Sequence, residues 1–132
     1  MSKPAVFISY SQSDRGWAQE FVKSLQDRGL SVWSDQNIRA GDLLLPALEK
    51  GLRESSVFVF LITPDTLRRQ NLFFEIGAAF AMGKSVVPIL SADVDPSELP
   101  PPLRVRKHLT RESPEATAEQ FVLQTLEPDR RA

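Results

Sequence analysis

Residues 57–62 read Val-Phe-Val-Phe-Leu-Ile, an unbroken run of β-branched, aromatic and aliphatic side chains. An alternating pattern would predict a strand with one solvated face, whereas a continuous apolar run is typical of a strand that is buried on both faces. Such strands occur in the middle of parallel sheets that helices cover on both sides. We therefore expect residues 57–62 to form the centre of an α/β fold.

Shorter apolar runs on either side of this segment predict the other strands of the sheet. They cover residues 5–9, 30–33 and 86–90, and residues 103–109 are predicted to form a short edge strand. Pro88 lies inside one of these runs, and because proline cannot donate a ladder hydrogen bond it indicates an edge or a bulge. Together the runs predict a parallel sheet of four to five strands.

Helical patterns separate the predicted strands. The small polar residues of segment 10–14 suit a loop and then a helix cap. Trp17, Phe21 and Leu25 recur four apart after it, and Gly29 follows where a left-handed C-terminal cap is expected. Further helices are predicted from Leu44, Leu48 and Leu52, from residue 63 to residue 84 with a break near residues 70–71, and from residue 114 after a Ser113 cap. The proline-rich residues 91–102 are expected to form a loop. This alternation predicts helices on both faces of the sheet.

Composition limits the kinds of protein that the chain can be. Its 132 residues, 42% of them hydrophobic, predict one domain over residues 1–132, with residues 127–132 as a frayed or truncated tail. A formal net charge of −1 offers no global field for nucleic acid or an anionic membrane. The chain has no cysteine and no apolar run long enough to span a bilayer, so we expect a cytoplasmic protein without metal ligation by sulfur.

Several enzyme classes lack their sequence signatures here. The six glycines form neither a dinucleotide fingerprint nor a phosphate-binding loop, which argues against hydride transfer and nucleoside triphosphate hydrolysis. His108 is the only histidine and follows a basic run, so no motif supports a Ser-His-Asp triad. We interpret His108 as a solvated surface residue, and we expect no bound metal and no cofactor.

Glu75 is the residue whose position most suggests chemistry. It interrupts an apolar helical run, and at 100° per residue it lies beside the stripe formed by Leu72, Ile76 and Ala79. A carboxylate is thus predicted at the margin of the core. The alternative is a surface glutamate that pairs with an arginine such as Arg68, and spacing alone does not decide between the two.

Three stretches of the sequence resemble the boxes of TIR domains. Residues 6–11 resemble the first box, residues 32–35 with Gly41 and Asp42 resemble the second strand and the loop after it, and residues 75–79 resemble the glutamate helix of bacterial members. The resemblance runs from residue 4 to residue 90, and more weakly to residue 126. It implies a single TIR domain with a flavodoxin-like fold.

The resemblance also implies an activity. In enzymatic TIR domains the corresponding glutamate is essential for cleaving the bond between nicotinamide and ribose in NAD+, and the match carries this catalytic role to Glu75. Nicotinamide leaves as a neutral ring and needs no protonating acid, unlike the leaving sugar oxygen in glycosidases. One carboxylate can then stabilise the positive charge that develops on the ribose. Attack by water gives ADP-ribose, and internal attack by adenine gives a cyclic isomer.

Further residues are implied to bind the substrate. Trp33 matches an aromatic residue that packs on nicotinamide, although a core tryptophan is an equal alternative. Tyr10 and Ser11 match the loop that borders the pocket, with ordinary loop capping as the alternative. Asp35 matches the start of the loop after the second strand, and the alternative is that it only shapes this loop. Asn71 stands where many enzymatic members have a tryptophan, and it can hydrogen-bond a ribose or adenine but offers no indole for stacking.

Partners and biological role rest on the resemblance alone. In enzymatic relatives the loop that matches residues 34–44 docks on a neighbouring TIR domain, which implies activation by self-association, with a fused or separate sensor module. The bacterial type of glutamate helix implies antiphage defence by depletion of NAD+. Two alternatives stay open: a non-catalytic TIR adaptor that acts by assembly, and a domain that senses NAD+ without turnover. The sequence does not choose between hydrolysis and cyclisation, nor does it define the sensor or the oligomer geometry.

Overall fold

The computed structural model describes residues 5–34, 53–68, 76–77, 79, 81–104 and 107–126. Its strands are β1 (Ala5–Ser9), β2 (Ser31–Ser34), β3 (Val57–Ile62), β4 (Ser85–Leu90) and β5 (Leu109–Thr110). Its α-helices are α1 (Arg15–Asp27), α3 (Pro64–Leu67), α5 (Pro101–Arg104) and α6 (Pro114–Phe121). The described residues also form the short 3-10 helices η1 (Gln12–Asp14) and η3 (Pro96–Glu98) and the π-helix η4 (Val122–Leu126).

The strands form one five-stranded sheet in the order β2-β1-β3-β4-β5, and every pairing is parallel. Strand β3 lies in the middle, with β1 on one side and β4 on the other. All six of its residues are buried, because side chains on both of its faces meet helices or loops. The predicted α/β fold and the predicted central strand are confirmed.

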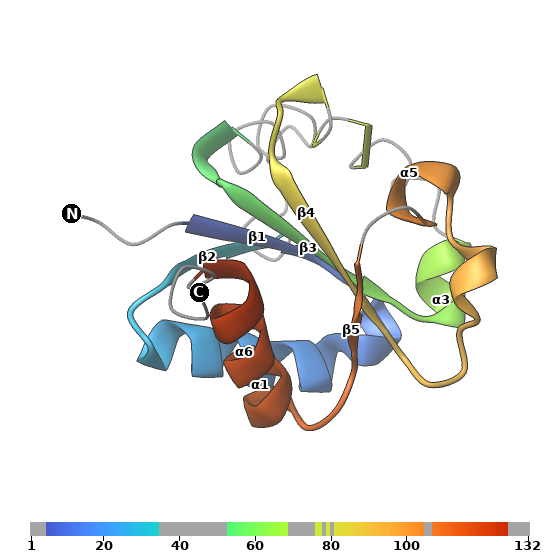
Figure 1. The fold of residues 1–132 in the computed structure, drawn as a ribbon. Helices are drawn as coiled ribbons and strands as arrows, with labels where there is room; N and C mark the ends of the chain where they lie inside the picture. The colour runs from blue at the N-terminus through green and yellow to red at the C-terminus, as the bar shows by residue number, and fades with distance from the viewer. Residues whose placement is uncertain are drawn as a thin grey trace, which may run out of the picture.

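Each face of the sheet carries its own apolar core. Helices α1 and α6 lie side by side over one face (Figure 1), where Phe21 and Phe121 meet edge to face. The opposite face packs against helical residues Ile76 and Ala79, and against Leu99 and Leu103 from the segment after β4. Helices therefore cover both faces, as the alternation of strands and helices predicts.

Two helix ends follow the predicted capping chemistry. Gly29 has a φ of 86°, a left-handed conformation that glycine adopts without steric strain, and it ends α1. At the start of α6 the Ser113 hydroxyl accepts a hydrogen bond from the Ala116 amide at 3.1 Å, and Pro114 occupies the first turn. These local signals fix where α1 stops and where α6 begins.

The region after β4 differs from the prediction of a plain loop over residues 91–102. It contains η3 and the start of α5, because prolines sit in the first turns, where a helix needs no N–H donor and a φ near −65° already suits it. The edge strand predicted over residues 103–109 is also too long. Leu103 and Arg104 end α5, and among the described residues that follow, the pairing with β4 involves Leu109 and Thr110.

Pro88 lies within β4, opposite Phe60 of β3. On the other side of β4, the described pairing with β5 begins one residue later, at Ile89. At the level of Pro88 this side of β4 is therefore an edge, which agrees with the predicted position for a residue without an N–H.

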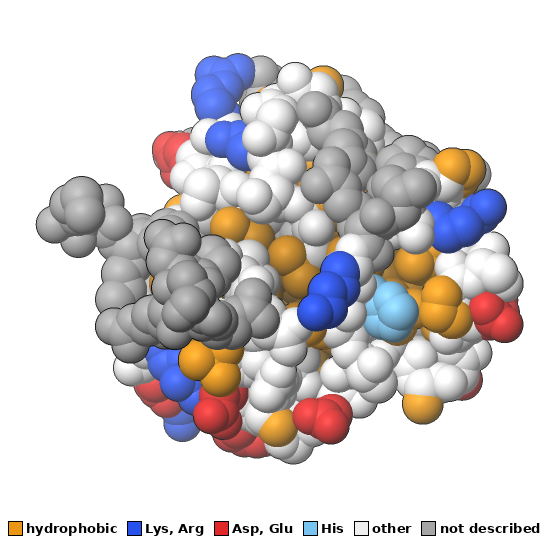
Figure 2. Space-filling view, in the orientation of Figure 1, with side chains coloured by type: hydrophobic (Ala, Val, Ile, Leu, Met, Phe, Trp, Pro, Cys, Tyr) orange, Lys and Arg blue, Asp and Glu red, His pale blue; other side chains and the backbone are white. Residues whose placement is uncertain are grey.

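Some predictions fall outside the described residues: the helix from Leu44 to Leu52, the break near residues 70–71, and the tail at residues 127–132. Within the described part of the chain, no helix has the length and apolar character to cross a bilayer. Figure 2 shows side chains of both charge signs on the same face of the molecule, in keeping with a formal net charge of −1.

Candidate functional site

A polar cavity of about 340 Å³ lies at the carboxyl edge of the sheet. Its walls come from the segments that follow β1, β3, β4 and β5: Ser13, Asp14, Thr63, Pro64, Asp65, Ser91, Asp93 and Arg111. The chain leaves β1 toward β2 on one side and leaves β3 toward β4 on the other, so the topology switches between β1 and β3. Open α/β sheets bind ligands at such switch points, outside the carboxyl ends of the strands.

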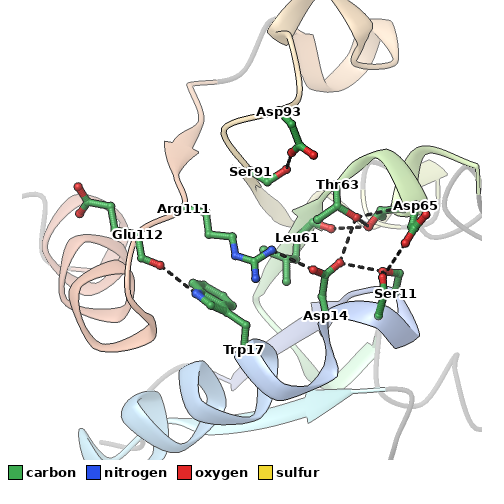
Figure 3. A network of polar contacts seen from close by, with 12 residues as sticks. Ser11, Asp14, Trp17, Leu61, Thr63, Asp65, Ser91, Asp93, Arg111 and Glu112 are labelled. Atoms are coloured by element: carbon green, nitrogen blue, oxygen red, sulfur yellow. Dashed lines mark hydrogen bonds and ion pairs between the residues drawn. The ribbon is translucent and has the colours of Figure 1, made fainter.

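The centre of this edge is the carboxylate of Asp14 (Figure 3). Its Oδ2 accepts hydrogen bonds from the hydroxyls of Ser11 at 2.8 Å and Thr63 at 3.0 Å. Its Oδ1 accepts from the Arg111 guanidinium at 2.9 Å. We call these four residues the Asp14 cluster. The cluster joins the loop after β1, the end of β3 and the segment after β5.

Asp14 stands at the N-cap position of α1, where the polar residues before the helix predict a capping side chain. The structure shows no such cap: the Asp14 carboxylate makes no hydrogen bond to the amides of the first helical turn. The reason is competition, because both carboxylate oxygens already accept from Ser11, Thr63 and Arg111. A residue that predicts local capping instead makes long-range tertiary contacts.

Arg111 is held on its other side by Trp17. The guanidinium carbon lies 4.8 Å from the centroid of the indole ring, within the range of a cation–π contact. The indole Nε1 in turn donates to the carbonyl oxygen of Glu112 at 2.9 Å. Ring and backbone thus fix the segment after β5 against the first turns of α1.

Asp65 forms a second link across the same edge. Its carboxylate accepts a hydrogen bond from the Ser13 hydroxyl at 2.7 Å and pairs with Arg68 in the next turn. The hydrogen bond from Ser13, and after it the interaction with Arg68, lowers the pKa of Asp65 below its ordinary 3.8. Asp65 is therefore ionised at neutral pH and ties η1 to α3.

Trp33 lies on the other side of the sheet, in β2. Its indole is half-buried and stacks on Phe7 of β1, with ring centroids 5.5 Å apart and planes 18° apart. The same apolar cluster contains Ile76, which directly follows Glu75 in sequence and is only 3% exposed. The two predictions for Trp33, a core residue and a surface for a flat ring, both agree with a ring that is packed on one side and half-buried overall.

Tyr10 and Ser11 are both buried, with 6% of each exposed. Tyr10 belongs to the core on the face covered by α1 and α6, opposite the face that holds Trp33. The Ser11 hydroxyl lies 3.0 Å from that of Ser13 and donates to Asp14. The structure therefore brings Ser11 to the cavity edge but does not bring Tyr10 and Trp33 together, and their roles in substrate binding stay predictions.

A family model described as "TIR domain" matches residues 6–122 of the chain. The chain belongs to the TIR-domain family. The match confirms the family that the three sequence boxes suggest, and it covers all of the sheet described above except Ala5.

One relative of this TIR domain in sequence is a protein of Methanobrevibacter olleyae named "Probable 2' cyclic ADP-D-ribose synthase TcpO", 32% identical over 90 residues. The alignment covers 64% of this chain and 26% of that protein, so it spans about a quarter of the relative's length.

Two solved structures share the fold of this TIR domain. A metazoan TIR-STING receptor from C. gigas in complex with 2',3'-cGAMP superposes with a TM-score of 0.76 at 22% identity, covering 89% of this chain and 38% of that one. The TIR domain of the Toll-related receptor TRR-2 from Hydra magnipapillata has a TM-score of 0.72 at 17% identity, covering 96% and 98%. The flavodoxin-like TIR fold is thereby confirmed.

Three predicted site residues of this TIR domain, Glu75, Asp35 and Asn71, lie outside the described residues. The structure adds three that sequence reasoning missed as a group: Asp14, Thr63 and Arg111. No local motif joins them, since Arg111 is 97 positions from Asp14. The one available signal is topological, because polar residues directly after parallel strands meet at the same edge.

The carboxylates of the described residues do not form a metal site. No group of three or more His, Cys, Asp or Glu side chains in this part of the TIR domain is placed to hold an ion. Asp93, for example, accepts a hydrogen bond from its neighbour Ser91 across the cavity from Asp14. The described edge is instead a hydrogen-bonded arrangement of hydroxyls, carboxylates and the guanidinium groups of Arg68 and Arg111.

Proposed function

We propose that this TIR domain is an NAD+ nucleosidase that cleaves the bond between nicotinamide and ribose, with Glu75 as its catalytic residue. The observation that carries the proposal is the sharing of one sheet face by Trp33 and Ile76. Ile76 is the sequence neighbour of Glu75, and it belongs to the cluster against which the half-buried indole of Trp33 packs. A flat aromatic surface on the face where the sequence neighbour of Glu75 packs suits a substrate with a flat cationic ring.

The chemistry needs one carboxylate and a site with little water. As the glycosidic bond lengthens, positive charge moves to the ribose, and the Glu75 carboxylate is proposed to stabilise that charge through the ribose hydroxyls. Trp33 would support the nicotinamide ring. Ser11, Tyr10, Asp35 and Asn71 remain proposed contacts to the rest of the nucleotide. NAD+ is the substrate in this scheme, and no cofactor takes part.

The relative from Methanobrevibacter olleyae is named as a probable synthase of 2' cyclic ADP-D-ribose, which supports NAD+ chemistry with a cyclic product. For this chain the product is proposed as ADP-ribose or a cyclic ADP-ribose isomer. We further propose activation by self-association with other TIR domains, control by a fused or separate sensor, and a cytoplasmic role in antiphage defence through NAD+ depletion.

The test is direct. Concentrated protein is incubated with NAD+, and chromatography follows nicotinamide together with ADP-ribose and its cyclic isomers. Glu75→Gln is the matched control, because an amide keeps the shape of the side chain and removes the charge that the developing cation needs. The proposal expects nicotinamide release by the wild-type protein and none by a folded Glu75→Gln variant.

The other outcomes identify the alternatives. Full activity of the folded Glu75→Gln variant would remove Glu75 from the mechanism. A wild-type protein that binds NAD+ without releasing nicotinamide would be a sensor. A protein that neither binds nor cleaves NAD+ but assembles with other TIR domains would be an adaptor.

A further inference from the structure

We infer that Asp14 is a positioning residue for the proposed reaction: its carboxylate fixes the loop after β1 to the start of the chain segment that runs from α3 to Glu75. The inference rests on the proposed function. It goes beyond that function by giving a role to the Asp14 cluster at the carboxyl edge of the sheet. Asp14 acts through other residues in this scheme and touches no reacting atom.

The first step is the environment of the carboxylate. The Asp14 side chain is only 11% exposed, and Ser11 and Thr63 are each 6% exposed. Each carboxylate oxygen has a protein donor: Oδ2 receives the two hydroxyls, and Oδ1 receives Arg111. A carboxylate held from both sides in this way cannot turn without breaking a charge-assisted hydrogen bond.

The second step is where the donors come from. Ser11 belongs to the loop that follows β1, which the resemblance to TIR enzymes places beside the substrate. Thr63 directly follows β3 and caps α3, because its Oγ1 accepts a hydrogen bond from the amide of Thr66 at 3.2 Å. Asp14 therefore sets the position of a proposed substrate loop relative to the helix that begins the segment bearing Glu75.

A parallel link strengthens this join. The Ser13 hydroxyl donates a hydrogen bond to Asp65 in the first turn of α3. Ser13 directly precedes Asp14, and Asp65 follows Thr63 by two residues. Movement of η1 would thus strain two contacts to α3 at once. Misplacement of reacting groups by about 1 Å can slow an enzyme roughly 100-fold, so a join of this kind affects rate even far from the chemistry.

The third step separates charge from shape. Asparagine has almost the same shape as aspartate, but it would lose the ion pair with Arg111 and present an NH₂ group on one side. Arg111→Lys retains a cation for Asp14, whereas Arg111→Gln removes it. The positive charge itself is expected to matter, so Lys should rescue part of what Gln loses.

The experiment compares Asp14→Asn, Arg111→Lys and Arg111→Gln with the wild-type protein at high protein concentration. Asp27→Asn is the matched control, since it removes the same charge from an exposed position at the far end of α1. Nicotinamide release gives kcat and KM. Hydrogen exchange of the peptides spanning residues 10–14 and 63–68, measured without substrate, reports how firmly the two segments are held together.

We expect Asp14→Asn and Arg111→Gln to lower kcat about 10- to 100-fold with KM changed less than about threefold, and to speed exchange in both peptides together. Arg111→Lys should lose less activity than Arg111→Gln because it keeps the positive charge, and Asp27→Asn should stay near the wild-type values. Wild-type kcat in Asp14→Asn, with or without faster exchange, overturns the positioning role and leaves the proposed function intact. A wild-type protein without nicotinamide release instead refutes the proposed function, and the positioning role with it.

Discussion

The indole of Trp33 lies nearly parallel to the ring of Phe7, with centroids 5.5 Å apart and planes at 18°. The two residues are register partners on adjacent parallel strands, so the stack follows from the pairing of β1 with β2. One side of the indole is thus held by the core, and this arrangement separates a structural contribution of Trp33 from a functional one.

Trp33→Ala should lose both contributions. Removal of a large, partly buried aromatic side chain is expected to lower the free energy of unfolding by about 3 kcal/mol, because the stack on Phe7 and its buried area disappear. Trp33→Phe should recover much of the stability. Urea unfolding measures the loss of stability, and nicotinamide release per folded molecule measures the loss of function. If the Ala variant cleaves NAD+ as fast as the wild type once folding is corrected for, Trp33 is a core residue only.

Gly77 and Gly83 provide a matched pair of substitutions. Among the described residues, apart from chain neighbours and the backbone of the same helix, no heavy atom lies within 4 Å of a Cβ atom built at either position. Of the two glycines, Gly83 has the left-handed backbone, with φ at 69°. Gly77→Ala should stabilise the protein by roughly 0.5–1 kcal/mol, because alanine loses less backbone entropy in a helix. Gly83→Ala should destabilise it, since a side chain strains that φ. Thermal unfolding measures both effects, and equal shifts of the melting temperature in the two variants would contradict the argument.

The hydrogen bond between Ser13 and Asp65 predicts a pH dependence. It lowers the pKa of Asp65 below 3.8, so the ionised form is favoured in the folded state. The resulting stability is present above the unfolded pKa and is lost as the pH falls through the folded pKa. The difference in melting temperature between wild type and Asp65→Asn should therefore shrink as the pH falls below 3.8. Ser13→Ala should move the NMR titration midpoint of Asp65 upward, and an unmoved midpoint would contradict the assigned cause.

Activity is expected to depend on protein concentration. The loop over residues 34–44 is predicted to dock on a neighbouring TIR domain and complete the site, so a dilute monomer should be nearly idle. Specific activity, as nicotinamide released per mole of protein, should rise steeply between low and high micromolar protein and with a crowding agent. Gly41→Pro, which restricts the loop backbone, should abolish the rise. Constant specific activity from protein shown to be monomeric would mean that one chain contains a complete site.

The fold could be predicted because its strongest signals are local. The continuous apolar run of β3, the four-residue spacing of Trp17, Phe21 and Leu25, and the capping residues Gly29 and Ser113 each specify one element, and the structure confirms them. The region after β4 was harder to predict. Prolines there indicate a stop to regular structure, yet a proline in a first helical turn is compatible with η3 and α5.

The candidate site could be predicted only in part, since its contacts are not local. The resemblance implies that Ser11 lies in the loop that borders the pocket, and the polar residues before α1 predict a helix cap. Asp14 instead binds Thr63 and Arg111, which a sequence pattern does not bring together. Tyr10 follows β1 and continues the alternation of Val6 and Ile8, so it lies in the core under α1 and α6.

The complete burial of β3 also determines what happens when the domain unfolds. Val57 to Ile62 is a six-residue segment of high β-propensity without charge, proline or glycine, the composition that stacks into cross-β assemblies once it is exposed. In the native sheet β1 and β4 occupy both of its edges, and helices on both faces exclude other chains. Heating removes this protection all at once, so unfolded molecules should aggregate faster than they refold. The apparent melting temperature would then depend on scan rate and protein concentration, as expected for a domain whose persistence is governed by kinetics.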